Sequence, residues 1–252
     1  MGTVFSFDIR REPVAGTAHA LADSLAWLHR MDVLFSTYRA DSQISRLDRG
    51  EITLAACDAE VREILELCEG AARVTDGRFT AYPGGRLDPS AMVKGWAVER
   101  VSSTLYDAGA HHHMVNGGGD IQCRGEAAPG RPWRVGIAHP FRRHGLAVVV
   151  DGVDLAVATS GSAERGHHIV DPATGRPATE LASITLVGRH ITEVDALATA
   201  AFAMGEAAGE WVRARQGIEA YAVNADGESW WTPGFTAHCP SLRPTAVGTP
   251  AA

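Results

Sequence analysis

The strongest constraint on the fold of this chain is the way its hydrophobic periodicity changes along the sequence. Residues 3–10 alternate as a strand does, with Phe5, Phe7 and Ile9 on one face. Helical spacing then dominates to about residue 107, and strand-like segments follow until a last helix and a closing hairpin. This order predicts an α+β domain with a mainly antiparallel sheet and packed helices, rather than a regular doubly wound fold.

Individual elements follow from the same patterns. Helices are predicted over residues 17–32, after Asp58, after Ser90 and over about residues 193–204, with Gly205 ending the last one. Strands are predicted over residues 113–115, 133–137, 146–150, 155–159 and 184–187, and a hairpin over 218–224 and 229–231. We expect one domain over residues 1–239 and a disordered tail over 240–252, which is rich in Pro, Thr, Ala and Gly.

Composition excludes several classes of protein. The net charge of -7 argues against nucleic acid as the main partner, because surfaces that follow phosphates are normally basic. No apolar run approaches the roughly 20 residues that span a bilayer, and the first residues lack the pattern of an export signal, so we expect a cytoplasmic protein without a membrane span. The four widely spaced cysteines fit neither a zinc site nor a disulfide framework.

Two residues of the last predicted helix could hold a metal ion. Asp195 and Thr199 are four residues apart and therefore share one helix face. A carboxylate and a hydroxyl suit Mg²⁺, which needs few protein ligands when substrate phosphates complete its shell. The alternative is an Asp that is favoured near a helix N-terminus, with Thr filling space.

Two further segments could approach a phosphate or a flat ligand. Asn116 precedes a run of three glycines that ends at Asp120; the run lets the backbone come close to a ligand, although a plain tight turn is the better interpretation of this segment taken alone. Asp88 and Lys94 flank a predicted helix N-terminus, which attracts phosphate. Lys94 is the only lysine in the chain, and its alternative role is a solvated surface charge.

The histidines divide into two groups. His168 precedes an apolar pair and an Asp-Pro turn, where it could accept a proton or lie on the surface without a role. His111, His112 and His113 look like a metal site, but successive strand side chains point to opposite faces and cannot all converge.

No single segment identifies the protein, but the order of these segments resembles the ApbE family, the FAD:protein FMN transferases. The resemblance runs from the start of the chain to the closing hairpin. The segments that carry it are Met1-Gly2-Thr3, Phe35-Ser36-Thr37-Tyr38 with Ser42 and Ser45, Asp88…Ala91…Lys94-Gly95-Trp96-Ala97-Val98, Asn116…Gly118-Gly119-Asp120, Thr159-Ser160-Gly161, His168-Ile169-Val170-Asp171-Pro172-Ala173-Thr174-Gly175-Arg176-Pro177 and Asp195-Ala196-Leu197-Ala198-Thr199.

The resemblance implies an ApbE-like, tunnelling-fold-like sheet and a role for each matching residue. His168 matches the residue that activates the acceptor hydroxyl. Three residues match the family's Mg²⁺ ligands, namely Ala91 through its carbonyl oxygen, Asp195 and Thr199. The residues that match the positions at which the family holds its substrate, FAD, are Met1, Tyr38, Asp88, Lys94, Asn116, Gly118, Gly119, Asp120, Ser160, Gly161 and Val170.

The implied reaction is a magnesium-dependent transfer of FMN from FAD to a Ser or Thr hydroxyl of an acceptor protein, with release of AMP. The same site could instead use water, as an FAD pyrophosphatase, or could bind flavin without catalysis. The chain also departs from the family. It reads Asp88-Pro89-Ser90-Ala91 where the family usually has D-L-G-G, and residues 80–87 replace a longer segment that contributes flavin contacts in many members.

Overall fold

The computed structural model describes residues 3–11, 16–163, 166 and 169–242. Within these residues seven strands form one sheet in the order β1-β2-β3-β6-β9-β10-β11, and every neighbouring pair is antiparallel. The α+β class with a mainly antiparallel sheet is therefore confirmed. The strands are β1 (Phe5–Ile9), β2 (His113–Gly117), β3 (Asp120–Arg124), β6 (Ala156–Gly161), β9 (Leu181–Gly188), β10 (Glu219–Asn224) and β11 (Ser229–Trp231).

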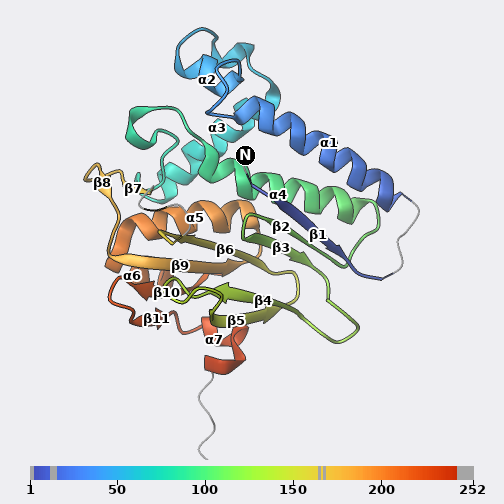
Figure 1. Ribbon diagram of the computed structural model, residues 1–252, viewed down its shortest axis with the longest axis vertical. Helices are drawn as coiled ribbons and strands as arrows, with labels where there is room; N and C mark the ends of the chain where they lie inside the picture. The colour runs from blue at the N-terminus through green and yellow to red at the C-terminus, as the bar shows by residue number, and fades with distance from the viewer. Residues whose placement is uncertain (1–2, 12–15, 164–165, 167–168, 243–252) are drawn as a thin grey trace, which may run out of the picture.

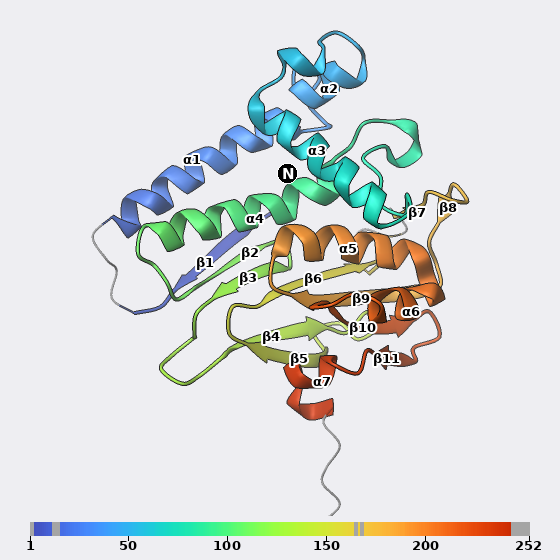
Figure 2. The same cartoon turned by 180° about the vertical axis from the view of Figure 1, so that it is seen from behind.

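The long helices cover one face of this sheet in two tiers (Figures 1 and 2). Helix α4 (Ser90–Asp107) packs on β2 and β3, and α5 (Ile191–Met204) packs on β6 and β9. Helices α1 (Thr17–Phe35) and α3 (Ala59–Val74) lie over them on the outer side. Helices α4 and α5 are thus enclosed between the sheet and the outer helices, so a polar group on their facing sides is removed from water.

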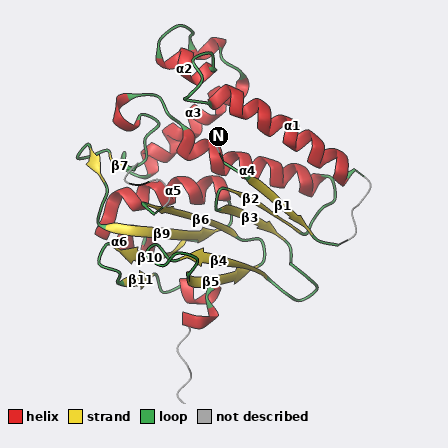
Figure 3. Cartoon of the chain, in the orientation of Figure 1, coloured by secondary structure: helices red, strands yellow, loops and turns green. Residues whose placement is uncertain are grey.

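A smaller layer covers the opposite face of the sheet (Figure 3). The hairpin of β4 (Trp133–Ala138) and β5 (Leu146–Gly152) packs there with α7 (Phe235–His238) around a second apolar core. Strand β9 is buried from Leu181 to Val187 because both of its faces are covered. The remaining elements are short: α2 (Gln43–Asp48), α6 (Ala208–Arg213), β7 (Val170–Asp171) and β8 (Arg176–Pro177).

Most predicted elements are present, with differences that have local causes. Gly205 ends α5 with a positive φ, as expected. Asp58 occupies the N-cap of α3 but its carboxylate binds Gln43 and Arg30 instead of the helix N–H groups.

The C-terminal segment is ordered for longer than expected. Pro240–Leu242 form a turn of 3₁₀ helix, and Leu242 packs against the second core. The rest of the expected tail lies outside the described residues. Among the helices of the described part of the chain, none combines the length and the apolar character needed to cross a bilayer.

The histidine run does not converge, as its strand position predicts. His113 is fully buried on β2, where its Nδ1 donates to the Ala110 carbonyl at 2.6 Å and its Nε2 lies 2.8 Å from the Ser102 hydroxyl. His112 instead accepts from the Glu126 N–H. Burial lowers the pKa of His113, because the enclosed site disfavours the imidazolium.

This burial predicts a pH-dependent stability. Below the ordinary histidine pKa of about 6.5 the unfolded chain gains a proton at His113 and the folded protein does not, so stability falls as pH falls. Urea unfolding of the wild type and His113→Asn should show a stability gap that is largest above pH 7 and narrows toward pH 5, by at most about 1.4 kcal/mol per pH unit. A constant gap across this range would contradict the assignment of His113 as a neutral core residue.

Candidate functional site

The candidate site is built on an unusually close, antiparallel contact between α4 and α5. Glu99 on α4 accepts from the N–H of Thr192, and one turn earlier the N–H of Gly95 donates to the Asp195 carboxylate at 3.0 Å. A side chain at Gly95 would place its Cβ 2.7 Å from the Ile191 carbonyl oxygen and 2.8 Å from the Asp195 Cβ. Only glycine therefore permits the two helices to meet at this point.

A buried cluster of three charged groups lies at this contact. Lys94 forms an ion pair with Asp120, at the start of β3, and its Nζ lies 3.7 Å from the Asp195 carboxylate. Asp120 and Asp195 are 1% and 3% exposed. The only lysine of the chain is thus held by acidic partners inside the fold, and the alternative of a solvated surface charge is wrong.

The cluster holds more negative than positive charge. Burial, followed by the charge of Asp120, raises the pKa of Asp195 to about 8. Burial also raises the pKa of Asp120, since it outweighs the attraction of Lys94. One ammonium faces two carboxylates, so the cluster favours a proton or a further cation beside Asp195.

The glycine-rich turn closes the hairpin of β2 and β3 directly beside this cluster. The Asn116 side chain accepts from the N–H of Gly119 at 2.9 Å and so fixes the turn. Gly118 has a φ of 63°, and a Cβ there would lie 2.1 Å from the Thr3 hydroxyl. The turn ends at Asp120, which binds Lys94, so turn and helix α4 are joined through one ion pair.

The end of β6 joins the same group of residues. The N–H of Thr159 lies 3.4 Å from the Asp120 carboxylate, on the oxygen that does not face Lys94. Ser160 is buried, and Gly161 packs against the Ala182 carbonyl, where a Cβ would come within 2.8 Å. The predicted residues of β6 and of the glycine-rich turn are therefore brought together by Asp120.

The proposed metal ligands fall on the facing sides of α4 and α5. The antiparallel contact matches Glu99 with Thr192 and Gly95 with Asp195. Ala91 lies about one turn before Gly95 on α4, and Thr199 lies about one turn after Asp195 on α5. In a regular α-helix the N–H of Gly95 donates to the Ala91 carbonyl oxygen, and in this protein the same N–H donates to the Asp195 carboxylate.

This donor set fits a hard cation. It offers a carboxylate, a hydroxyl and a carbonyl oxygen, which are the ligands that Mg²⁺ prefers, next to a surplus of buried negative charge. Across the described residues no cluster of three or more His, Cys, Asp or Glu side chains is arranged for a metal ion.

The other predicted residues are placed less closely. Tyr38 lies on the loop between α1 and α2 and is 98% exposed. Asp88 accepts from the N–H of Ser90 at 3.0 Å, at the first residue of α4. Val170 lies in β7, which packs against α5. Met1 and His168 lie outside the described residues, although Thr3 contacts the glycine-rich turn.

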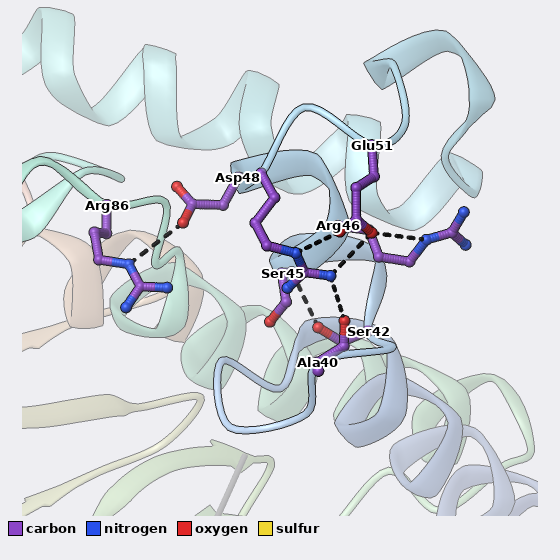
Figure 4. A network of polar contacts seen from close by, with 8 residues as sticks. Ala40, Ser42, Ser45, Arg46, Asp48, Glu51 and Arg86 are labelled. Atoms are coloured by element: carbon purple, nitrogen blue, oxygen red, sulfur yellow. Dashed lines mark hydrogen bonds and ion pairs between the residues drawn. The ribbon is translucent and has the colours of Figure 1, made fainter.

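The short segment before α4 is anchored to α2. Its Leu87 N–H donates to Asp48 at 2.8 Å. Figure 4 shows Arg86 approaching the other oxygen of the same carboxylate, at 3.4 Å. The hydrogen bond from Leu87, followed by that from Arg86, lowers the pKa of Asp48 below its ordinary value. The loop that carries Asp88 to the start of α4 is therefore held in place by α2.

Several contacts that hold the elements of the site together join residues far apart in the sequence and were not predicted from it. Arg78, which follows α3, binds Asp171 of β7 at 2.9 Å across 93 positions of sequence, and so ties β7 to the helical layer. The N–H of Thr159 in β6 likewise contacts Asp120 of β3. The carboxylate of Glu99 in α4 likewise accepts from Thr192 of α5. Nothing in the local pattern of residues signals such pairs.

A cavity of about 600 Å³ lies outside this group of residues. Residues of α3 and α5 form its walls, and none of the predicted site residues lines it. Its lining consists of Glu63, Glu66, Leu67, Gly70, Ala71, Val74, Met92, His190, Thr192, Glu193, Ala196, Leu197, Arg215, Gln216 and Ile218.

Comparison with known proteins gives a consistent result. The model of the ApbE family matches residues 1–84 and 80–222. The FAD:protein FMN transferase of Vibrio cholerae is 35% identical over 133 residues, 49% of this chain and 40% of that protein. The FAD:protein FMN transferase of Rhodobacter capsulatus is 31% identical over 195 residues, 71% of this chain and 37% of that protein. The chain thus spans less than half the length of these curated relatives.

Solved structures agree on the fold. The ApbE protein from Thermotoga maritima superimposes with a TM-score of 0.84 at 21% identity, covering 94% of this chain and 96% of that one. The flavin transferase ApbE from Vibrio cholerae gives a TM-score of 0.81 at 23% identity, with the same coverage. At this level of identity the likeness concerns the fold alone.

The close contact at Gly95 yields a prediction for stability. Gly95→Ala should destabilise the protein by about 1–3 kcal/mol, because the added methyl overpacks the contact with Ile191 and Asp195. Gly70→Ala is the matched control: Gly70 lies within α3 with only the end of Arg73 near, at 3.8 Å, so that change should be neutral or stabilising by up to about 1 kcal/mol. Urea unfolding measures both, and equal stability of Gly95→Ala and the wild type would contradict the close approach.

Proposed function

Because the chain belongs to the ApbE family, we propose that it transfers FMN from FAD to a Ser or Thr hydroxyl of an acceptor protein and releases AMP. The observation that carries this proposal is the buried cluster of Lys94, Asp120 and Asp195, which lies where α4, the glycine-rich turn and α5 meet. The names of the curated relatives, FAD:protein FMN transferase, support the same reaction.

The chain supplies separate surfaces for the flavin ring and for the diphosphate of FAD. Gly118 and Gly119 are exposed at the tip of the β2–β3 hairpin, and at Gly119 neither a Cβ nor a neighbouring atom within 4 Å of its place keeps a flat ring away from the backbone. Lys94 and the first N–H groups of α4 favour the negative charge of the diphosphate. The ion pair with Asp120 orients the Lys94 side chain and compensates its positive charge inside a mostly buried site.

Three oxygens of α4 and α5 are proposed to hold Mg²⁺. They are the carbonyl oxygen of Ala91, the carboxylate of Asp195 and the hydroxyl of Thr199. When bound, the ion would neutralise charge on the diphosphate and on the departing AMP. The surplus negative charge at Asp195 and the hard character of the three donors support this assignment.

The reaction itself needs one proton acceptor. The acceptor hydroxyl oxygen forms a bond to the FMN phosphorus, the bond from that phosphorus to the AMP oxygen breaks, and the hydroxyl proton passes to a base. We assign this base to His168 on the resemblance of residues 168–177 to the family. Arg78 supports the assignment indirectly, since it fixes Asp171 three residues further along the chain.

The metal assignment predicts the effect of a change at Asp195. Asp195→Asn keeps an acceptor for the N–H of Gly95 but removes the charge, so transfer should fall about 100-fold or more. Excess EDTA should abolish wild-type transfer. The control is Glu193→Gln, an exposed carboxylate in the first turn of the same helix, which should keep full activity. AMP release at varied Mg²⁺ measures these effects, and a fully active Asp195→Asn would remove this residue from the site.

The base assignment predicts an asymmetry between neighbouring histidines. His168→Ala should lose transfer by about 10²–10⁴-fold while FAD still binds, because an unassisted hydroxyl is a poor nucleophile. His167→Ala should lose little if the segment is extended, because adjacent side chains of an extended segment point to opposite sides. The wild-type rate should also fall below about pH 6.5, as the imidazole is protonated. Equal losses in both variants would point to damage of the segment rather than loss of a base.

A further inference from the structure

Helix α5 begins without a cap of its own. His190 is its N-cap residue, and the side chain of His190 makes no bond to the N–H groups of the first turn. These N–H groups have no partner within a helix and need one from elsewhere, all the more because Ile191 is fully buried. The start of the helix that carries Asp195 therefore depends on other elements.

Two side chains from neighbouring elements supply the missing partners. Gln122 of β3 accepts from the N–H of Ile191 at 3.0 Å, and its amide group donates to the carbonyl oxygen of Arg189 at 3.2 Å. Glu99 of α4 accepts from the N–H of Thr192 at 3.0 Å, and its other oxygen lies 2.7 Å from Nδ1 of His190. The last loop residues and the first helical residues are thus both held from outside.

Glu99 is suited to this task by charge and by burial. Its side chain is 20% exposed, against 51% for His190. Burial acts to raise the pKa of Glu99, but hydrogen bonds from Thr192 and His190 outweigh it and hold that pKa below its ordinary value. A carboxylate at this position also interacts favourably with the positive end of the α5 dipole.

The position of Glu99 links the cap to the site. Thr192 lies less than one turn before Asp195 on α5, and Glu99 lies about one turn after Gly95 on α4. The two helices are consequently joined at two successive levels, by Glu99 with Thr192 and by Gly95 with Asp195. A shift of α5 along or about its axis would have to break the first contact before it could displace the second.

We propose that Glu99 is a positioning residue, which fixes the start of α5 with Gln122 and thereby holds Asp195 and Thr199 opposite Gly95 and Ala91. This proposal rests on the proposed function, because it gives those residues a metal to hold. Glu99 acts through α5 and does not reach the reacting atoms. Its loss should weaken metal binding while leaving the flavin contacts of the glycine-rich turn unchanged.

The test measures binding of Mn²⁺, a paramagnetic substitute for Mg²⁺, to the full chain with FAD present, by electron paramagnetic resonance. Glu99→Ala should weaken Mn²⁺ binding about 10–100-fold, as is usual when a partner that orients a metal ligand is removed. Glu99→Gln, whose amide oxygen can still accept from Thr192, should recover most of this loss. Glu193→Ala, which removes an exposed carboxylate from the same first turn, should bind Mn²⁺ like the wild type.

Two further measurements separate positioning from general stability. FAD affinity without metal, from flavin fluorescence, should stay within about twofold of the wild type in all variants, and thermal unfolding shows that each is folded. Should Glu99→Ala not fold, Glu99→Asp keeps the charge but shortens the reach, and should weaken Mn²⁺ binding several-fold. A variant at Glu99 that melts earlier but binds Mn²⁺ like the wild type would overturn the proposal. Absence of Mn²⁺ binding by the wild type would instead overturn the proposed function, and the positioning role with it.

Discussion

The close contact of α4 and α5 at Gly95 is the feature on which the rest of the site depends. It removes Asp195 from water and sets its carboxylate against the backbone of α4, where Lys94 is the nearest positive charge. Burying a carboxylate in this way is unfavourable unless other groups compensate it. The buried Asp195 carboxylate lies at the place where we propose that the diphosphate of FAD and Mg²⁺ bind.

The three-layered architecture explains why this contact can be held. The sheet supports α4 and α5 from one side, and α1 and α3 cover them from the other (Figure 2). Asp120 connects the layers, since it accepts from Thr159 of β6 and binds Lys94 of α4. Residues from four separate parts of the sequence, on α4, β3, β6 and α5, therefore meet around the Asp120 carboxylate and Lys94.

The sequence was informative where function depends on local spacing. Asp195, the glycine-rich turn that ends at Asp120 and the isolated Lys94 all mark positions that the fold brings together. Contacts between residues that are far apart in the chain could not be predicted from the sequence. The requirement for glycine at position 95 arises from Ile191 and Asp195, nearly 100 residues away, and the cap of α5 comes from β3 and α4. Helix α2 was also missed, because six residues are too few for a clear periodicity.

The central claim is that this site joins FMN to a protein rather than to water. The most direct measurement is intact-protein mass spectrometry of a Ser- or Thr-containing acceptor protein after incubation with the enzyme, FAD and Mg²⁺, with AMP measured in the same sample. The acceptor should gain one FMN group, less one water, for each AMP released. Release of free FMN and AMP beside an unmodified acceptor would contradict it and indicate hydrolysis of FAD.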